Sequence, residues 1–317
     1  MDISVVIPLY NEAESLPELF EWIARVMKEH SFSYEVIMVD DGSRDASWQT
    51  IGELAKKSKA VRGIRFMRNY GKSAALYCGF RKAEGDVVIT MDADLQDSPD
   101  EIPALNKMIT EEGYDVVSGW KQHRKDNKLT KNLPSKLFNA VARRVSGTKL
   151  HDMNCGLKAY RSEVVKNIEV YGEMHRYIPY IAKNAGYSRI GELKVHHQKR
   201  KYGRTKFGMS RFANGLLDLI SLWFLSTFGK KPMYFFGYGG LAMFFVGSIM
   251  AIWIIAAKLI RQNQGIPYRA VSDQPLFYLS LLAVVLGVMF FLAGFIGEMI
   301  ARSSTERNRY NIREELR

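Results

Sequence analysis

Two carboxylates, Asp92 and Asp94, stand two residues apart directly after an apolar run that ends at Met91. Residues two apart on an extended chain point the same way, so both carboxylates can face one ligand. Hard oxygen donors of this kind suit Mg²⁺ or Mn²⁺, and a cation held there would bind a diphosphate. For this motif alone an acidic turn in solvent is the simpler interpretation, so the rest of the chain must decide between the two.

The apolar run before these carboxylates belongs to an alternating pattern of strands and helices. Strands are predicted at 3–8, 34–40, 61–66, 86–91 and 114–118. Helices with apolar residues three and four apart are predicted at 15–30, 47–58, 73–83 and 100–112. This rhythm predicts an α/β fold, a mostly parallel sheet with covered faces. Ligands of such sheets bind beyond the carboxyl ends of the strands, where residues 8–12, 40–43 and 92–94 would converge.

Two familiar phosphate-binding motifs are missing from this half of the chain. No G-x-G-x-x-G follows the first strand, so the usual dinucleotide fingerprint is absent. The segment Gly71-Lys72-Ser73 looks like the end of a phosphate loop. Phe66, however, stands where such a loop has its first glycine, and no apolar strand leads directly into the segment. We therefore exclude a nucleoside triphosphatase.

The last third of the chain is too apolar to belong to the same soluble domain. No charged residue occurs from Met233 to Ala257, and a second apolar run extends from Leu276 to Gly297. As helices, both runs are long enough to cross a hydrocarbon core of about 30 Å. Buried core helices seldom run beyond about 20 residues without a charge, so two membrane spans are predicted. Gly237, Gly239 and Gly240 would permit the close helix approach of a homo-oligomer.

Basic residues at the ends of the spans predict their orientation. They precede the first span and follow the second, as Lys230, Lys231, Arg302, Arg307 and Arg309. By the positive-inside rule both ends face the cytoplasm and the short loop faces out. Three basic residues in that loop, Lys258, Arg261 and Arg269, weaken the asymmetry. Nothing at the N-terminus resembles a signal peptide, so the large N-terminal domain is expected in the cytoplasm.

The net charge of +12 is concentrated in residues 121–149 and 194–211, which implies an anionic partner. No zinc-finger spacing, RNA-binding aromatic motif or heptad-linked basic helix accompanies these clusters, so no nucleic acid partner is expected. Anionic lipid is the better partner because the membrane spans follow directly. Cys78 and Cys155 have no C-x-x-C spacing and fit a reducing compartment as ordinary buried residues.

Three motifs occur together in one order: VVIPLYNE at 5–12, VDDGS at 39–43 and DADLQ at 92–96. With them come HDMNCGLK at 151–158, the basic segment RKYGRTK at 200–206 and the paired spans. Over essentially its whole length the chain resembles the polyprenyl-phosphate glycosyltransferases. These are inverting enzymes of the glycosyltransferase-A fold, such as dolichol-phosphate mannose synthase and the bactoprenol glucosyltransferases. One departure is Gly119-Trp120-Lys121, where relatives tend to have Gly-x-Arg.

The resemblance implies a set of donor-binding residues. The nucleotide-sugar contacts are Pro8, Tyr10, Glu12, Val39, Asp41, Asp92, Ala93 and Lys121, and the metal ligands are Asp94 and Gln96 with Asp92 beside them. A carboxylate such as Asp41 can accept hydrogen bonds from ribose hydroxyls or a base N–H. Two local alternatives stay open, because Glu12 also suits the N-terminal end of a helix and Ser43 also suits a helix cap.

The resemblance also implies the acceptor side of the site. Asp152 corresponds to the proposed catalytic base. A lipid phosphate, however, is already largely ionised at neutral pH and needs little help from a base. The alternative is that Asp152 orients the acceptor or the sugar hydroxyls. The acceptor phosphate is assigned to Arg200, Arg204, Lys206 and Arg176. A planar guanidinium can grip a phosphate through two parallel hydrogen bonds. A general juxtamembrane basic patch that attracts anionic lipid would have the same composition.

The sequence therefore predicts a Rossmann-like glycosyltransferase-A domain at 1–206 and interfacial amphipathic helices at 207–231. Two transmembrane helices follow at 232–300 and a basic cytoplasmic tail at 301–317. The resemblance implies a bacterial inner-membrane enzyme that uses Mg²⁺ or Mn²⁺ to transfer a sugar to a polyprenyl phosphate. The expected donor is UDP-glucose or a related UDP-hexose. The alternatives are a processive polysaccharide synthase, whose Q-x-x-R-W signature is absent at 198–202, and a non-catalytic scaffold that binds nucleotide sugars.

Overall fold

The protein is described by a computed structural model that covers residues 1–121, 150–172, 174–198, 201–202, 224, 232–267, 269–303 and 312–316. The chain forms two compact units. The first combines Met1–Leu219 with Glu306–Arg317, and the second is Ile220–Thr305. The expectations for residues 122–149 and 203–223, which include the interfacial helices, lie outside the described part of the chain.

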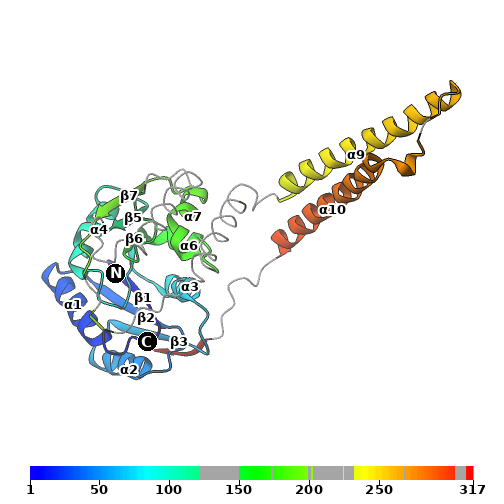
Figure 1. Ribbon diagram of the computed structural model, residues 1–317. Coiled ribbons are helices and arrows are strands. Elements are labelled where there is room, and N and C mark those ends of the chain that lie inside the picture. Colours follow the sequence, from blue (N-terminus) through cyan, green and yellow to red (C-terminus); the bar gives the residue numbers. More distant parts are fainter. Residues whose placement is uncertain are drawn as a thin grey trace. The chain divides into compact units, whose positions relative to one another are not determined.

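The first unit is built on one eight-stranded sheet (Figure 1). Its strands are β1 (Ile3–Leu9), β2 (Tyr34–Asp40), β3 (Val61–Phe66), β4 (Val87–Thr90), β5 (Val116–Trp120), β6 (Lys158–Arg161), β7 (Ile190–Lys194) and β8 (Ile312–Leu316). They lie in the order β7-β5-β6-β4-β1-β2-β3-β8. The pairs β4–β1, β1–β2, β2–β3 and β5–β7 are parallel, whereas β6 and β8 run antiparallel to their neighbours.

Helices follow the strands as the sequence rhythm predicts. They are α1 (Leu16–Glu29), α2 (Ser47–Lys57), α3 (Lys72–Lys82), α4 (Ile102–Thr110), α6 (Ser162–Asn167) and α7 (Ile178–Asn184), with 3-10 turns η1 (Pro99–Glu101) and η2 (Met174–Tyr177). The mostly parallel α/β architecture predicted from the sequence is therefore confirmed. Its polar strand ends on β1, β2 and β4 share one edge of the sheet, because these three strands are parallel neighbours.

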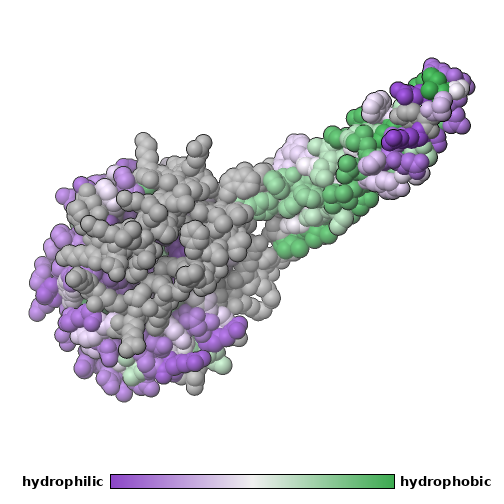
Figure 2. Space-filling model, viewed as in Figure 1, coloured by the Kyte–Doolittle hydropathy of each residue, from purple (hydrophilic) through white to green (hydrophobic). Residues whose placement is uncertain are grey.

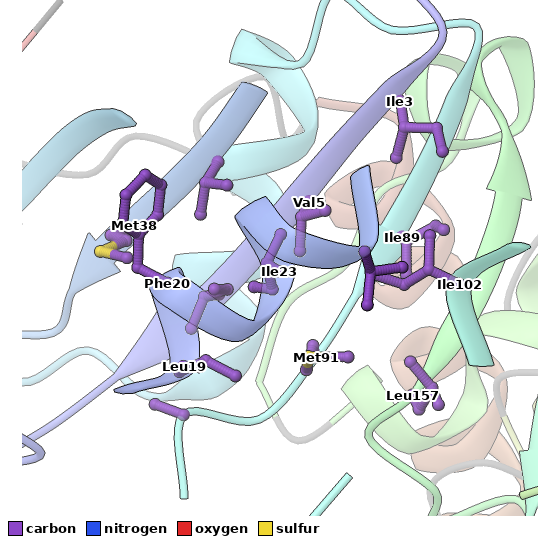
Figure 3. Packing of buried hydrophobic residues seen from close by; sticks show 14 of the residues in the cluster. Ile3, Val5, Leu19, Phe20, Ile23, Met38, Ile89, Met91, Ile102 and Leu157 are labelled. Carbon is purple, nitrogen blue, oxygen red and sulfur yellow. The ribbon is translucent and has the colours of Figure 1, made fainter. Parts of the chain in front are cut away.

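The sheet is buried on both faces, which explains why its central strands are almost continuously apolar. Alternate residues of β1 enter different clusters: Val5 packs with Leu19 and Ile23 of α1 on one face (Figure 3), and Val6 packs with α3 on the other. Gly79 makes this second contact possible, since a Cβ there would lie 2.3 Å from Val6 Cγ1. Burying each such aliphatic side chain contributes about 1.5–3 kcal/mol, which fixes the strands that carry the polar ends.

The C-terminal segment returns to this sheet after the apolar helices. Residues 312–316, which the sequence analysis placed in a basic tail without expecting a strand, form β8 antiparallel to β3. Leu316 packs against the core cluster, and Glu315 pairs with Lys82 of α3 at 2.8 Å. The strand therefore covers the β3 edge, which would otherwise present unpaired backbone groups.

The second unit is a hairpin of two long helices, α9 (Pro232–Asn263) and α10 (Pro275–Ser303), joined through the short 3-10 turn η3 (Val271–Asp273). Both are long and apolar enough to cross a membrane, and only 17% of each apolar window is buried. Such exposure is unlike the core helix of a soluble protein. Figure 2 shows hydrophobic residues along the visible face of this hairpin, with Trp253 for example 65% exposed.

Small residues hold the two helices of the hairpin together. A Cβ on Gly240 would lie 2.6 Å from the carbonyl oxygen of Gly287, and a Cβ on Gly247 would lie 2.6 Å from that of Ser280. Gly240, which the sequence analysis considered for contacts between copies, therefore packs within the hairpin. Glycine at such positions lets helix backbones approach closely in a lipid environment.

Candidate active site

The loops after β1 and β2 are joined by hydrogen bonds at the polar edge of the sheet. The backbone N–H of Asn11 donates to Ser43 Oγ at 2.9 Å, and Asn11 Oδ1 accepts from the backbone N–H of Arg44 at 2.8 Å. Asn11 has a φ of 54°, a left-handed conformation that asparagine tolerates better than most residues. The register also pairs Pro8 with Val39. Several predicted nucleotide-binding residues are thus brought together.

A cleft of about 240 Å³ opens beside these loops. It is lined by Tyr10, Gly42, Ser43, Arg44, Arg65, Phe66, Met67, Arg68 and Asn69. Gly42 is required there, because its φ is +72° and a Cβ would lie 2.6 Å from the backbone carbon of Arg68. Of the predicted nucleotide contacts Tyr10 lines the cleft, while the segment 65–69 that forms its other wall was not anticipated.

Asp41 fixes the end of that second wall. Its carboxylate accepts hydrogen bonds from the backbone N–H groups of Tyr70 at 2.7 Å and Gly71 at 2.9 Å. Burial raises the pKa of Asp41 to about 6, and the two hydrogen bonds only partly oppose that rise. In this structure Asp41 therefore orients the loop that leads from the cleft to α3. Its contact with a base or ribose stays a prediction.

Asp92 lies at the carboxyl end of β4 among ammonium groups. It forms an ion pair with Lys72, the first residue of α3, and its side chain is 34% exposed. Burial alone would raise the pKa of Asp92, but Lys72, Lys121 and Lys158 outweigh it and lower the pKa to about 2. Gly156 leaves room for this carboxylate, since a Cβ there would lie 2.4 Å from Asp92 Oδ2. Asp92 is thus held as an anion.

The residues after Asp92 turn back across the sheet edge. Asp94 Oδ1 accepts from the backbone N–H of Gln96 at 3.2 Å, and Leu95 between them has a φ of 58°. Gln96 is bound in turn to Gln198, whose backbone N–H donates to the Gln96 carbonyl at 2.9 Å. This links the acidic segment to the chain that leads into the basic residues 200–206.

The acidic segment is chemically suited to share a divalent cation with a phosphate ligand. Within the described part of the chain, no three His, Cys, Asp or Glu side chains are grouped so that they could hold a metal ion. Asp92 and Asp94 at one strand end nevertheless supply carboxylate oxygens, and Gln96 adds an amide oxygen. Mg²⁺ in such proteins is usually held by one or two carboxylates together with substrate phosphates and water, so this donor set fits.

Lys121 has a buried partner of its own. Its Nζ lies 2.6 Å from Oδ1 of Asp97, whose side chain is fully buried, and its own side chain is 11% exposed. Burial would lower the pKa of Lys121, but the neighbouring Asp97 raises it above its usual value. The ammonium is therefore charged and fixed on Asp97, close to Asp92. Its predicted contact with a nucleotide sugar stays a prediction.

Asp152 is buried in a segment that is tied down on several sides. Its Oδ1 accepts from the backbone N–H of Asn154 at 3.0 Å, and its own backbone N–H donates to Oε1 of Glu192 on β7 at 3.0 Å. The side chain of Lys158, itself buried, donates to the Cys155 carbonyl. Burial is the main cause that lowers the pKa of Lys158. The segment is thus held rigidly beside the lysines around Asp92.

The described residues of the predicted acceptor region lie near the start of α3. His175 and Arg176 belong to η2, where the backbone N–H of His175 donates to Ser73 Oγ at 3.0 Å. Burial first, and then the neighbouring Lys72 and Arg176, lower the pKa of His175 well below its usual value. His175 thus packs against α3. Arg200, Arg204 and Lys206 lie outside the described residues.

Three charged residues of this site were missed by sequence reasoning. Lys72, Lys158 and Glu192 were assigned no role, yet they contact Asp92, Cys155 and Asp152 respectively. Lys72 had a signal, because it stands in the Gly-Lys-Ser segment that was set aside for lacking a phosphate-loop glycine. Lys158 had one as well, because it ends the HDMNCGLK motif at 151–158, whereas Glu192 carries no local signature.

Comparison with known proteins shows the fold and the family of this chain. The fold is similar to that of glucosyl-3-phosphoglycerate synthase from Mycobacterium tuberculosis, solved with Mn²⁺, UDP and glucosyl-3-phosphoglycerate. The two share 19% identity and a TM-score of 0.53, with 71% of this chain and 79% of that one covered. This likeness establishes the glycosyltransferase-A fold. The family model of glycosyl transferase family 2 matches residues 4–169, and the chain belongs to that family.

Two similar relatives cover nearly the whole chain. Dodecaprenyl-phosphate galacturonate synthase of Rhizobium johnstonii is 33% identical over 96% of this chain and 88% of its own length. Undecaprenyl-phosphate 4-deoxy-4-formamido-L-arabinose transferase of Shewanella sediminis is 37% identical over 99% of this chain and 92% of its own. The resemblance to polyprenyl-phosphate glycosyltransferases that the motifs predicted is therefore confirmed.

Proposed function

We propose that the protein transfers a sugar from a nucleotide diphosphate sugar to a membrane polyprenyl phosphate, with inversion at the anomeric carbon. The observation that carries this proposal is the similarity to two polyprenyl-phosphate sugar transferases over 96% and 99% of the chain, membrane hairpin included. In this proposal the cleft beside Tyr10 holds the nucleoside of the donor. The charged residues around Asp92 hold its sugar diphosphate.

A UDP-sugar is the proposed donor, and the choice of sugar is open to a direct test. From the sequence, UDP-glucose or a related UDP-hexose is the expected donor. The two relatives are named for galacturonate and for 4-deoxy-4-formamido-L-arabinose, neither of which is glucose. A donor panel must therefore include uronic and amino-pentose sugars as well as glucose.

The chemistry assigned to the site is a single in-line displacement. An ionised oxygen of the lipid phosphate forms a bond to the anomeric carbon as the bond from that carbon to the nucleoside diphosphate breaks. The second pKa of a phosphate monoester is near 6, so the nucleophile is largely ionised at neutral pH. Asp152, the proposed base, removes a remaining proton or orients the acceptor and sugar hydroxyls. Asp92 lies beside the sugar diphosphate.

A divalent cation is proposed at the same strand end. Asp94 and Gln96 would hold it with Asp92 beside them, and bound Mg²⁺ or Mn²⁺ would offset negative charge that develops on the leaving diphosphate. The solved fold neighbour that contains Mn²⁺ and UDP supports a divalent ion in general. Arg176, Arg200, Arg204 and Lys206 remain the proposed acceptor-phosphate ligands.

The connectivity of the sheet supports a cytoplasmic site on an inner-membrane protein. Strands β1 to β7 precede the apolar hairpin and β8 follows it, yet all belong to one sheet. A chain that rejoins its own sheet must cross a membrane an even number of times, and two spans satisfy this. The basic residues that flank the hairpin then favour the cytoplasmic side for the first unit.

The test is synthesis of a labelled glycolipid by the purified full-length protein. The protein in detergent receives undecaprenyl phosphate and one of UDP-glucose, UDP-galacturonate, UDP-4-deoxy-4-formamido-L-arabinose or GDP-mannose, each with and without EDTA. We expect one donor to give a polyprenyl-phosphate sugar of inverted anomeric configuration, with release of its nucleoside diphosphate. A scaffold would bind the nucleotide sugar without releasing nucleoside diphosphate. A processive synthase would extend a polymer without needing the lipid phosphate.

A further inference from the structure

Lys72 connects two parts of the site that are far apart in the sequence. It begins α3, and its ammonium pairs with Asp92 at the end of β4. The side chains of the two residues are 31% and 34% exposed. A ligand at this strand end can therefore reach both groups, which distinguishes the pair from a closed structural ion pair.

The other two ammonium groups around Asp92 are mostly buried and bound to other partners. Lys121 is fixed on the buried Asp97 and its side chain is 11% exposed. Lys158 is 3% exposed and donates to the carbonyl of Cys155. Among these three lysines, Lys72 is the one whose charge is accessible and whose partner, a carboxylate in the same site, can be exchanged for a ligand.

The chain leading into Lys72 comes directly from the nucleoside cleft. Arg68 and Asn69 line that cleft, and Asp41 then holds the backbone N–H groups of Tyr70 and Gly71. Gly71, with a φ of +96°, turns the chain into α3. Lys72 therefore directly follows the fixed Gly71, three residues after Asn69 of the cleft wall, and its side chain reaches from there to Asp92.

We propose that Lys72 binds the diphosphate of the donor, an assignment that rests on the proposed function. A nucleotide sugar with its nucleoside in the cleft and its sugar beside Asp92 must place its diphosphate between Asn69 and Asp92. That is the interval that the Lys72 side chain spans. An ammonium there pairs with the phosphate oxygens and offsets the charge that grows on them as the sugar leaves.

The proposed contact also gives the ion pair with Asp92 a role. The Lys72 ammonium and the Asp92 carboxylate neutralise one another. When the diphosphate binds, Lys72 exchanges part of its contact with Asp92 for phosphate oxygens, and Asp92 becomes available to the sugar. A simpler alternative is that Lys72 only neutralises Asp92, and the two roles give different results when both residues are changed.

The test compares the binding of UDP and of uridine to the full-length protein without lipid acceptor, by calorimetry and by competition. Lys72→Met should weaken UDP binding by about 10- to 100-fold, as expected for loss of a charged hydrogen bond, and should leave uridine binding within about twofold. Lys72→Arg should retain part of the UDP affinity. Lys107→Met, which removes a lysine 63% exposed on α4, is the matched control and should bind UDP normally.

The double variant Lys72→Met with Asp92→Asn separates the two roles. If Lys72 binds phosphate, the double variant stays as weak for UDP as Lys72→Met. Recovery of UDP affinity in the double variant would assign Lys72 to neutralising Asp92 and overturn the proposal. An equal loss of UDP and uridine affinity would overturn it in favour of a structural role of α3.

Two further results complete the test. Normal UDP binding by Lys72→Met with a raised KM for polyprenyl phosphate would assign Lys72 to the acceptor phosphate and overturn the donor assignment. Failure of the unsubstituted protein to bind UDP or to form any glycolipid would instead overturn the proposed function itself. The two failures are therefore distinguishable by whether the unsubstituted protein is active.

Discussion

Glu192 Oε1 accepts a hydrogen bond from the backbone N–H of Asp152 at 3.0 Å, and the same oxygen accepts from the backbone N–H of His151 at 2.8 Å. The other carboxylate oxygen lies 2.8 Å from His151 Nδ1. The Glu192 side chain is only 13% exposed. One carboxylate on β7 thus fixes two consecutive residues of the segment that carries the proposed base, and we expect Glu192 to act as a positioning residue.

Removing this anchor should slow turnover without weakening donor binding. We expect Glu192→Ala to lower kcat by about 10- to 100-fold, because small displacements of catalytic groups have effects of this size, while the Kd for UDP stays unchanged. Glu192→Gln keeps one acceptor oxygen and should be less impaired. Glu163→Ala, which removes an exposed partner of Arg161, serves as the control. A rise in the Kd for UDP with normal kcat would contradict the positioning role.

The role of Asp152 itself can be read from the rate of its asparagine variant. If Asp152 is the base, Asp152→Asn should lower kcat by about 10²- to 10⁴-fold. If the lipid phosphate reacts through its own ionisation, Asp152→Asn should lose less rate and should retain an acidic limb near pH 6. Steady-state rates of glycolipid formation from pH 5 to pH 8 distinguish the two.

The central strands could be predicted because burial on both faces leaves an apolar run in the sequence. The predicted bounds of β2 and β3 match the structure. The strands that were missed depend on their partners instead. β6 (Lys158–Arg161) has four residues with a charge at each end, and β8 (Ile312–Leu316) has three charged residues among five. Pairing with β4 and β3, respectively, decides their conformation, and the local sequence pattern does not predict this pairing.

The same distinction applies to the site. Asp92 and Asp94 could be anticipated because the end of a buried parallel strand is a defined place in this type of sheet. The contacts of Lys72 and Glu192 could not, since their partners are 20 and 40 residues away and meet them only through packing. Sequence reasoning thus identified groups at strand ends, and the structure added the charges that neutralise and orient them.

Glycolipid synthesis should require a divalent cation that Asp94 binds. We expect EDTA to abolish glycolipid synthesis and Mn²⁺ or Mg²⁺ to restore it. Asp94→Asn should lower kcat by about 100-fold or more and raise the Mn²⁺ concentration needed for half-maximal rate, because a cation in such sites contributes several kcal/mol to the transition state. Asp100→Asn, an exposed carboxylate of η1, is the matched control. Unchanged Mn²⁺ dependence in Asp94→Asn would exclude Asp94 as a ligand.

Burial of Asp41 should make stability depend on pH between about 4 and 6. Its pKa is raised from 3.8 to about 6 in the folded protein, so within this window the unfolded chain releases the Asp41 proton and the folded one keeps it. Stability therefore falls as pH rises, by about 3 kcal/mol for a shift of this size. Asp41→Asn lacks this titration. The thermal midpoint of the unsubstituted protein should thus decline relative to Asp41→Asn from pH 4 to pH 6, and a constant difference would contradict the raised pKa.

The C-terminal strand should stabilise both the first unit and the cleft beside Tyr10. Arg65 and Phe66 line the cleft and pair in register with Glu314 and Ile312 of β8. Deleting residues 312–317 uncovers this edge and the contact of Leu316 with the core, so the thermal midpoint should fall by about 5 °C and UDP binding should weaken. Deletion of residue 317 alone is the control, because it leaves β8 complete. If the longer deletion keeps both the midpoint and the UDP affinity, β8 stabilises neither the first unit nor the cleft.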